Sequence, residues 1–188
     1  MSDAIRVGLV GFGYASKTFH APLIGGTPGM ALKAVASSDA DKVHADWPGV
    51  KVMSAPGDLL DDPDIDLVVI ATPNDTHFPL AKAALEAGKH VVVDKPFTVT
   101  LSQARELESL AKHCGRILSV FHNRRWDSDF LTVSALINEG QLGEVCYFES
   151  HFDRFRPQVR QRWREQAGPG SGIWYDLSTR SWCCLACR

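Results

Sequence analysis

A pair of glycines near the start of the chain has the spacing of a phosphate-binding turn. Gly11 and Gly13 directly follow the apolar run 5–10 and precede a segment whose composition suits a helix. Gly11 permits a tight turn and Gly13 permits close approach of a phosphate, while Phe12 and Tyr14 complete the turn. We therefore predict a dinucleotide-binding turn at residues 11–14, with a turn that only joins strand to helix as the alternative.

The same stretch nearly matches the phosphate-binding loop of nucleoside triphosphatases. Ser16-Lys17-Thr18 stands where that loop has Gly-Lys-Ser/Thr. Ser16 supplies a side chain where the loop needs a glycine for its backbone geometry around the phosphates. The sequence thus favours a dinucleotide site, in which Ser16 replaces the usual Gly or Ala.

Two serines follow the second predicted strand, at the place where a NAD-specific site carries an acidic residue. That acid binds the ribose 2′-hydroxyl and repels a 2′-phosphate. Ser37 and Ser38 cause no such repulsion, and Lys42 follows shortly after them. We expect these serines to contact the cofactor and NADP to be preferred, with NAD as the alternative because Asp39 lies close by.

Lys95 follows the apolar run 91–93 within the sequence Asp94-Lys95-Pro96. The carboxyl end of a central strand is the edge at which open α/β sheets bind ligands. This places an ionisable lysine at the predicted ligand edge, and we expect Asp94 and Lys95 to lie beside the cofactor. The alternative is a surface lysine in a turn between strand and loop.

The elements that must position these residues alternate between strands and helices. Apolar runs predict strands at 5–10, 31–36, 65–71, 91–93 and 117–121. Helical spacing predicts helices at 15–24, between Asn74 and Gly88, and from a capping box at Thr100 and Gln103 to Gly115. Such alternation implies a parallel sheet with helices on both faces. We predict the α/β class, as a Rossmann-type doubly wound parallel sheet followed by the start of a second α/β domain.

After residue 121 the pattern changes to a predicted helix at 128–139 and a predicted strand at 145–152. We expect the parallel sheet to form one domain at 1–121 and a second domain to begin at 122–177. Residues 178–188 show neither apolar periodicity nor turn residues, so we expect an out-of-frame tail there. Cys184 and Cys187 have CxxC spacing within this tail but lack partners, so no metal site is predicted.

The composition is that of a folded, soluble protein. The 188 residues carry 20 basic and 22 acidic side chains, a net charge of −2, and 45% of them are hydrophobic. Charge this close to neutral argues against general polyanion binding. No stretch reaches the ~18 apolar residues of a membrane span and no secretion leader is visible, so we expect a cytoplasmic protein without membrane contact. His20 and His113 lack metal-ligand spacing and are expected to make local hydrogen bonds.

Five arginines between residues 154 and 164 form a basic segment. A nucleic-acid site would also need an aromatic stacking platform or a recognition helix, and the sequence shows neither beside them. We expect instead a loop that lines an anionic cofactor or substrate pocket, and no nucleic-acid partner.

Several motifs that follow one another along the chain resemble those of the Gfo/Idh/MocA family of oxidoreductases. They are the Gly11-x-Gly13 turn, the segments 71–77 and 86–90, and Asp94-Lys95-Pro96, in which Asp94 replaces the commoner Glu. The resemblance extends to about residue 177. It implies NAD(P)-dependent hydride transfer between the nicotinamide and a carbinol or carbonyl carbon of a sugar, a polyol or a similar small molecule. It also implies an NAD(P)-binding Rossmann domain at 1–121, an incomplete substrate and oligomerisation domain at 122–177, and a homo-oligomer for the full-length relatives.

The resemblance assigns roles to individual residues. It implies that Lys95 contacts the substrate hydroxyl and assists proton transfer. The further cofactor contacts that it implies are Thr72, Pro73, Asn74, His77, Asn123, Trp163 and Arg164.

One active-site motif of this family, Gly-x-x-x-Asp-x-x-x-His, is only partly present. Asp176 matches its aspartate as a second catalytic residue, but Arg180 stands at the position of its histidine. The rest of the family's second domain does not follow. We therefore expect a C-terminally truncated chain with little or no catalysis, and a non-catalytic dinucleotide-binding fragment is the alternative to the enzyme.

Overall fold

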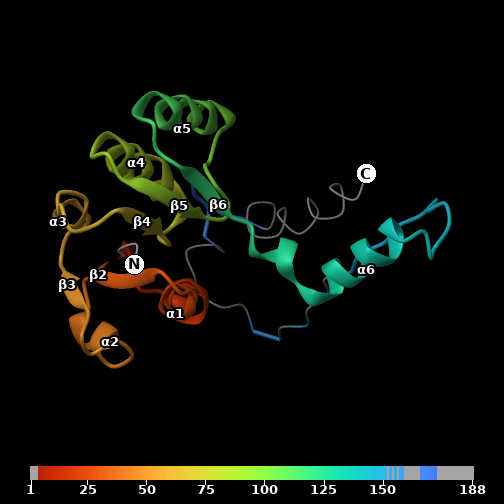
Figure 1. Cartoon of the computed structure of the whole chain (residues 1–188), viewed down its shortest axis with the longest axis horizontal. Coiled ribbons are helices and arrows are strands. Elements are labelled where there is room, and N and C mark those ends of the chain that lie inside the picture. Colours follow the sequence, from red (N-terminus) through yellow and green to blue (C-terminus); the bar gives the residue numbers. More distant parts are fainter. Residues whose placement is uncertain (1–3, 152, 154, 156, 159–165, 173–188) are drawn as a thin grey trace. The chain divides into compact units, whose positions relative to one another are not determined.

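The computed structural model (Figure 1) describes residues 4–151, 153, 155, 157–158 and 166–172. The chain divides into two compact units, Met1–Phe121 and His122–Arg188. All strands of the described sheet belong to the first unit.

In the described part of the first unit, six parallel strands form one sheet in the order β3-β2-β1-β4-β5-β6. The strands are β1 (Ile5–Val10), β2 (Met30–Ala36), β3 (Lys51–Met53), β4 (Leu67–Ile70), β5 (His90–Asp94) and β6 (Leu118–Phe121). The chain starts at β1, builds outward to β3 and then returns to the other side of β1. This order confirms the predicted Rossmann-type doubly wound sheet, and it places the topological switch point between β1 and β4.

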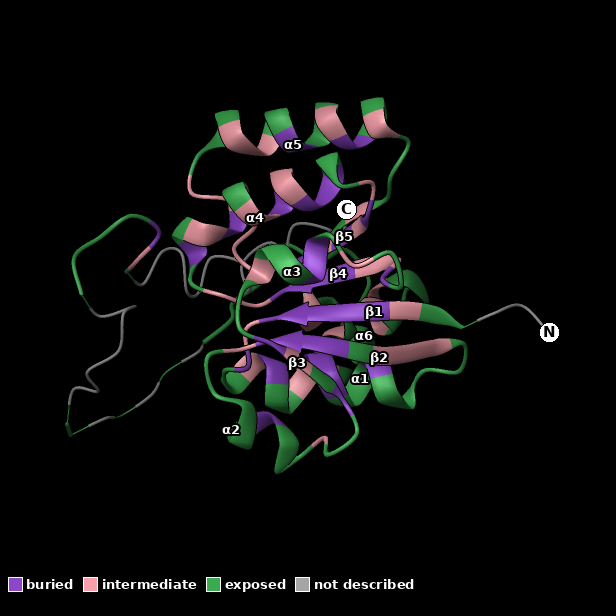
Figure 2. Ribbon diagram, turned by 90° about the vertical axis from the view of Figure 1, so that its left-hand side faces the viewer, coloured by how far each residue is buried: buried purple, intermediate pink, exposed green. Residues whose placement is uncertain are grey.

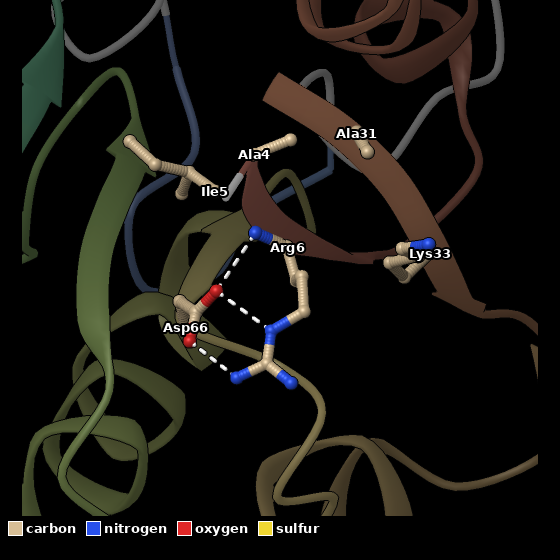
Figure 3. Close-up of a pocket in the computed structure, with 6 residues that line it drawn as sticks. All are labelled: Ala4, Ile5, Arg6, Ala31, Lys33 and Asp66. Carbon is tan, nitrogen blue, oxygen red and sulfur yellow. Dashed lines mark hydrogen bonds and ion pairs between the residues drawn. The ribbon is translucent and has the colours of Figure 1, made fainter. Parts of the chain in front are cut away.

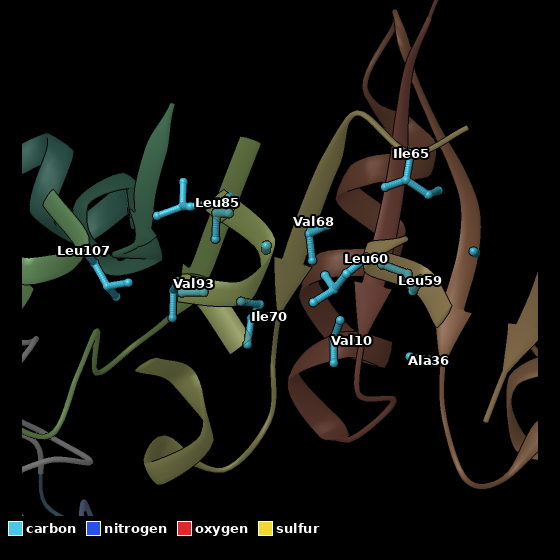
Figure 4. Close-up of a cluster of buried hydrophobic side chains, with 14 of the residues drawn as sticks. Val10, Ala36, Leu59, Leu60, Ile65, Val68, Ile70, Leu85, Val93 and Leu107 are labelled. Atoms are coloured by element: carbon cyan, nitrogen blue, oxygen red, sulfur yellow. The ribbon is translucent and has the colours of Figure 1, made fainter. Parts of the chain in front are cut away.

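Helices cover both faces of this sheet. They are η1 (Ser16–His20), α1 (Ala21–Gly26), α2 (Ala40–His44), α3 (Pro56–Leu60), α4 (Asn74–Glu86) and α5 (Leu101–Cys114). Residues of α3, α4 and α5 form one buried cluster with the sheet (Figure 4), and residues of α1 and α2 form a second one. The parallel sheet is therefore buried on both sides, as its nearly continuous apolar strands require.

Strand residues alternate between the two clusters. In β4, Val68 and Ile70 belong to the cluster with α3 to α5, whereas Val69 belongs to the other. Gly8 of β1 faces α3, where an added Cβ would lie 2.6 Å from Leu59 Cδ2. Helix α3 therefore packs directly on the backbone of β1, one of the buried strands seen in Figure 2.

Helix α5 begins as its sequence predicts. The Gln103 N–H donates to Thr100 Oγ1 and the Thr100 N–H donates to Gln103 Oε1, which confirms the capping box. The helix ends at Gly115, whose φ of 63° is in the left-handed region that favours glycine.

The predicted helix at 15–24 contains a π turn that the sequence analysis did not predict. In η1 the Ala21 N–H donates to Ser16 O, five residues back instead of four. Pro22 follows directly and has no N–H, and in a regular helix its ring would clash with the carbonyl of Thr18. The wider turn accommodates this proline, as π turns do where the regular ladder is interrupted.

The second unit begins with the 3-10 turn η2 (Asn123–Trp126) and helix α6 (Ser128–Asn138), which confirms the helix predicted at 128–139. No residue of α6 is buried. The strand predicted at 145–152 is wrong for residues 145–151, which are not in a strand, and residue 152 lies outside the described residues. A strand needs a neighbour for its backbone hydrogen bonds, and this described segment pairs with none.

Each helix in the described part of the chain is too short or too polar to cross a lipid bilayer.

Candidate dinucleotide site at the carboxyl edge of the sheet

Four loops that carry predicted site residues leave the same edge of the sheet. They follow the carboxyl ends of β1, β2, β4 and β5. The loop after β1 contacts its neighbours directly, because the Gly11 N–H donates to Ala36 O at the end of β2, over 2.9 Å. The Ala71 N–H, just after β4, donates to Val10 O over 3.0 Å. The predicted residues therefore gather at the switch point, where open α/β sheets bind ligands.

Gly11 is required by the fold itself. Its φ is +88°, and an added Cβ would lie 2.9 Å from Ala71 O and 3.1 Å from Thr72 Cγ2. The turn after β1 thus presses against the loop after β4.

Gly13 differs, because the protein's own packing does not explain it. The residue is exposed, its φ is not in the left-handed region, and an added Cβ would meet no atom within 4 Å. The space above its backbone is open. A pyrophosphate that approaches this backbone fits the site and gives a reason for a glycine here.

The Ser16 side chain stabilises the turn after β1 by a hydrogen bond to its backbone. Its side chain is fully buried and its hydroxyl donates to Gly11 O over 2.8 Å. This bond explains why a serine can replace the usual Gly or Ala.

The two aromatic residues of the turn have different surroundings. Phe12 is buried in the core, so it can contribute to the predicted turn through its backbone. The Tyr14 ring is 78% exposed beside Gly13 and makes an edge-on contact with Phe19. Tyr14 therefore remains available to a ligand.

The loop after β2 holds the residues that were predicted to select the cofactor. Ser38 is exposed, and Ser37 Oγ accepts a hydrogen bond from the Asp39 N–H. Asp39 caps α2, with its Oδ1 accepting the Lys42 N–H over 3.0 Å. One carboxylate oxygen of the nearest acid is thus engaged in capping a helix.

His77 joins the loops after β4 and β5. The ring is fully buried, with Nδ1 2.8 Å from Pro96 O and Nε2 3.0 Å from Thr72 O. A neutral imidazole can donate only one of these bonds, whereas an imidazolium donates both. With its ring fully buried and each ring nitrogen facing a backbone carbonyl, His77 connects the two loops, and the direct cofactor contact that the resemblance implied stays a prediction.

The rest of that loop borders the edge itself. Pro73 is exposed, Thr72 is half-buried and Asn74 is buried as the first residue of α4. The Thr76 hydroxyl lies 2.6 Å from Thr72 Oγ1, so the beginning of α4 is tied to this loop.

Lys95 stands at the end of β5 as predicted. Both Asp94 and Lys95 are half-buried, and the Lys95 N–H donates to Asp94 Oδ1 over 2.8 Å. The bond between Lys95 and Pro96 is cis. The carboxylate and the lysine therefore share one tight turn at the ligand edge.

Sequence reasoning missed the importance of His20, for which it expected an ordinary local hydrogen bond. The ring is buried and its Nε2 has no hydrogen-bond partner, although it lies 3.8 Å from Asp94 Oδ2. The π turn sets the direction of this ring, and a sequence pattern would reveal that turn only through Pro22.

The remaining predicted residues fall outside this edge. Asn123 begins η2 in the second unit. Trp163, Arg164 and Asp176 lie outside the described residues, as do all five arginines of the basic segment. In the part of the chain that the structure describes, no group of three or more His, Cys, Asp or Glu side chains could hold a metal.

A hollow at the opposite, amino edge of the sheet offers a contrast (Figure 3). Arg6, Lys33 and Asp66 lie along it with Ala4, Ile5 and Ala31. Arg6 donates three hydrogen bonds to the Asp66 carboxylate, from its backbone N–H, its Nε and its Nη2, over 2.7 to 2.9 Å. Together these bonds lower the pKa of Asp66 to about 2.

Comparisons with known proteins agree with this architecture. Residues 5–122 match the oxidoreductase family with an NAD-binding Rossmann fold, and residues 134–180 match the C-terminal alpha/beta domain of that family. The uncharacterized oxidoreductase YdgJ of Escherichia coli K12 is 78% identical over 95% of this chain and 51% of its own length. The scyllo-inositol 2-dehydrogenase (NADP(+)) IolW of Bacillus subtilis is 38% identical over 94% of this chain and 49% of its own length.

Solved structures show the same similarity. The Yersinia pestis protein YPO2259 superimposes with a TM-score of 0.93 at 67% identity, covering 99% of this chain and 53% of the other. The chain spans about half the length of the curated relatives that it matches. Its Rossmann sheet, its glycine turn and the two matched domains show that the chain belongs to the Gfo/Idh/MocA family of NAD(P)-dependent oxidoreductases.

Proposed function

We propose that this chain carries the nucleotide-binding part of an oxidoreductase that acts on a sugar, a polyol or a similar small molecule. The hydride would pass between the nicotinamide and a carbinol or carbonyl carbon. The observation that carries the proposal is the open backbone at Gly13, in the turn after β1 whose Gly11 contacts the loop of Thr72. The name of IolW supports the substrate class, because that relative is an inositol dehydrogenase.

The chain's own residues have distinct tasks in this proposal. The backbone from Gly11 to Gly13 binds the pyrophosphate, and the loop from Thr72 to Asn74 lines the cofactor. Lys95 holds or moves the proton of the substrate hydroxyl, with Asp176 as its partner in the second domain. The nicotinamide, when bound, supplies the hydride chemistry. A homo-oligomer would complete the enzyme.

The proposed cofactor preference is NADP. Ser37 and Ser38 place no acid at the end of β2, exposed Lys42 is close in sequence, and Asp39 is engaged in capping α2. IolW, a relative, is named for NADP(+). The proposal follows from the absence of repulsion toward a 2′-phosphate.

Titration of the chain with NADPH and NADH, followed by nicotinamide fluorescence, tests both the site and the preference. We expect NADPH to bind at least as tightly as NADH, and Ser38→Asp to weaken NADPH about tenfold, about 1.4 kcal/mol. Ser109→Asp adds the same charge at an exposed position of α5 and serves as the control. A tenfold preference for NADH would show that Asp39 occupies the ribose site, and no binding of either would contradict the proposed function.

A non-catalytic dinucleotide-binding fragment is the second candidate, and Arg180 at the place of the family's histidine favours it. Catalysis needs groups held within hydrogen-bond reach of the substrate. An assay of the chain with both cofactors over a panel of sugars and polyols separates the candidates. Binding of NADPH without turnover would support the fragment, whereas turnover comparable to that of a two-domain relative would exclude it.

A further inference from the structure

His20 is a buried polar group that the proposed function does not use. It is the last residue of the π turn η1 and is 4% exposed. Its Nε2 is shielded from solvent and has no hydrogen-bond partner. Buried polar atoms are nearly always hydrogen-bonded, so an unpaired ring nitrogen requires an explanation.

The acceptor that faces this nitrogen is the carboxylate of Asp94. Its Oδ2 lies 3.8 Å from Nε2, while its Oδ1 accepts the Lys95 N–H over 2.8 Å. A water between Nε2 and Oδ2 would need two hydrogen bonds of about 2.8 Å each, which this separation allows only in a sharply bent arrangement. A small movement of the carboxylate, in contrast, would close the gap.

Phe121 holds the imidazole in place. The centroids of the two rings are 4.3 Å apart. Phe121 also pairs with Asp94 across β5 and β6, so the ring and the carboxylate lie beside neighbouring strand ends. His20 therefore lies where the helix after the glycine turn, β5 and β6 meet, and all three elements belong to the first unit.

We propose that His20 is a positioning residue for Lys95. Its Nε2–H donates to the Asp94 carboxylate when that side chain moves about 1 Å toward it, to the ordinary hydrogen-bond distance. The carboxylate is then held from both sides and fixes the turn that carries Lys95. The role of Lys95 itself rests on the proposed function, whereas the link from His20 to Asp94 does not.

The link would also connect the two halves of the site. His20 belongs to the helix that starts after Gly13, and Lys17 of that helix donates its N–H to Gly13 O over 3.1 Å. A phosphate bound at the turn and the proton-handling lysine would thus both be connected to this helix. Packing alone would not need a histidine, because an apolar ring could cover Phe121 without burying an unpaired nitrogen.

Two measurements on the chain test this proposal. Long-range proton–nitrogen NMR of the ring shows which nitrogen carries the proton, and the reaction of Lys95 with an amine-acylating ester, followed by mass spectrometry, reports how firmly its turn is held. The variants are His20→Leu, which removes the donor, His20→Gln, which keeps a donor near Nε2, and Asp94→Asn. His113→Leu, at an exposed position of α5, is the matched control.

We expect a proton on Nε2 in the parent chain and a displaced Nε2 resonance in Asp94→Asn. Loss of the link should make Lys95 react about threefold faster in His20→Leu, because the turn opens more often, while His20→Gln and His113→Leu stay near the parent rate. An unprotonated Nε2 would overturn the proposal, and so would an Nε2 resonance that has the same position in Asp94→Asn as in the parent chain. So would equal Lys95 reactivity in the folded His20→Leu and His20→Gln chains.

If His20→Leu does not fold, Asp94→Asn still decides the question through the NMR signal of the His20 ring. NADPH titration of the same variants separates this proposal from the proposed function. A parent chain with the intact NMR link but no NADPH binding would contradict only the function.

Discussion

At the amino edge of the sheet, charged side chains bond to one another and to backbone carbonyls, whereas the carboxyl edge has two features that packing among the described residues does not explain. Arg6 holds Asp66, and buried Lys89 donates to Asp62 O and Ile65 O over 2.7 and 2.9 Å. At the other edge, nothing lies above Gly13 and the Nε2 of His20 lacks a partner. The difference teaches that the polar residues at the amino edge are satisfied within the fold, whereas Gly13 and His20 at the carboxyl edge need the roles that are proposed for them above.

The strongest test of this contrast is Gly13→Val. A side chain at this position would occupy the space of the pyrophosphate, so we expect NADPH affinity to fall about 100-fold, about 2.7 kcal/mol. Urea unfolding should be unchanged, because an added Cβ meets no atom within 4 Å. Fluorescence titration and urea denaturation of the same sample measure the two quantities.

Two other glycines supply the controls for that experiment. Gly49→Val should change neither quantity, since Gly49 is exposed, has no left-handed φ and has equally open surroundings. Gly11→Val should lower both, since its φ of +88° and the nearby Ala71 O belong to the fold. Unimpaired NADPH binding by Gly13→Val would remove the contrast between the two edges.

A second test concerns the amino edge. Lys89→Met keeps the aliphatic length but leaves the carbonyls of Asp62 and Ile65 without their donor. We expect the free energy of unfolding to fall by about 2 kcal/mol, the cost of buried unpaired groups, with NADPH affinity unchanged. The control is Lys112→Met, whose exposed pair with Glu108 should contribute much less. A loss of NADPH affinity in Lys89→Met would show that the two edges are not independent.

The smallest expected effect is that of the pair between Arg6 and Asp66. The side-chain hydrogen bond from Arg6 is the main reason that the pKa of Asp66 falls from 3.8 to about 2. A lowered carboxyl pKa stabilises the fold above pH 3.8, and this contribution disappears as the pH falls toward about 2.

We therefore expect Asp66→Asn to lower the free energy of unfolding by about 1 kcal/mol at pH 7, after allowance for the partial exposure of both side chains. The difference in unfolding free energy between this variant and the parent should become smaller when urea unfolding is repeated at pH 3. Asp64→Asn is the matched control, because Asp64 meets the same guanidinium but is 82% exposed. A difference that stays constant with pH would show that the ion pair is not its source.

Most of the first unit could be predicted from the sequence, because its buried strands are apolar runs and α5 carries its own capping box. Shorter elements could not be predicted. The three residues of β3 show no period, and this strand exists through its pairing with β2. Residues 145–151 show the reverse case, since a strand-like segment without a pairing neighbour is not a strand.

The candidate site was predictable to the extent that it depends on strand ends. Gly11, Ser37, Thr72 and Lys95 each follow a strand, and parallel strands bring such positions to one edge. The roles of Phe12, His77 and His20 depend on contacts with residues far away in the sequence. A sequence pattern gives the type of these residues but not the carbonyl, ring or carboxylate that each one faces.

The π turn before Pro22 has a consequence for the comparison and redesign of related sequences. A turn closed over five residues holds one residue more than a regular turn, so it is equivalent to a single-residue insertion in the helix. Deleting one residue between Ser16 and His20 would restore regular winding and leave Pro22 without the room that the π turn provides. Alignments that place a gap elsewhere in this helix would therefore pair His20 with residues that do not face Asp94.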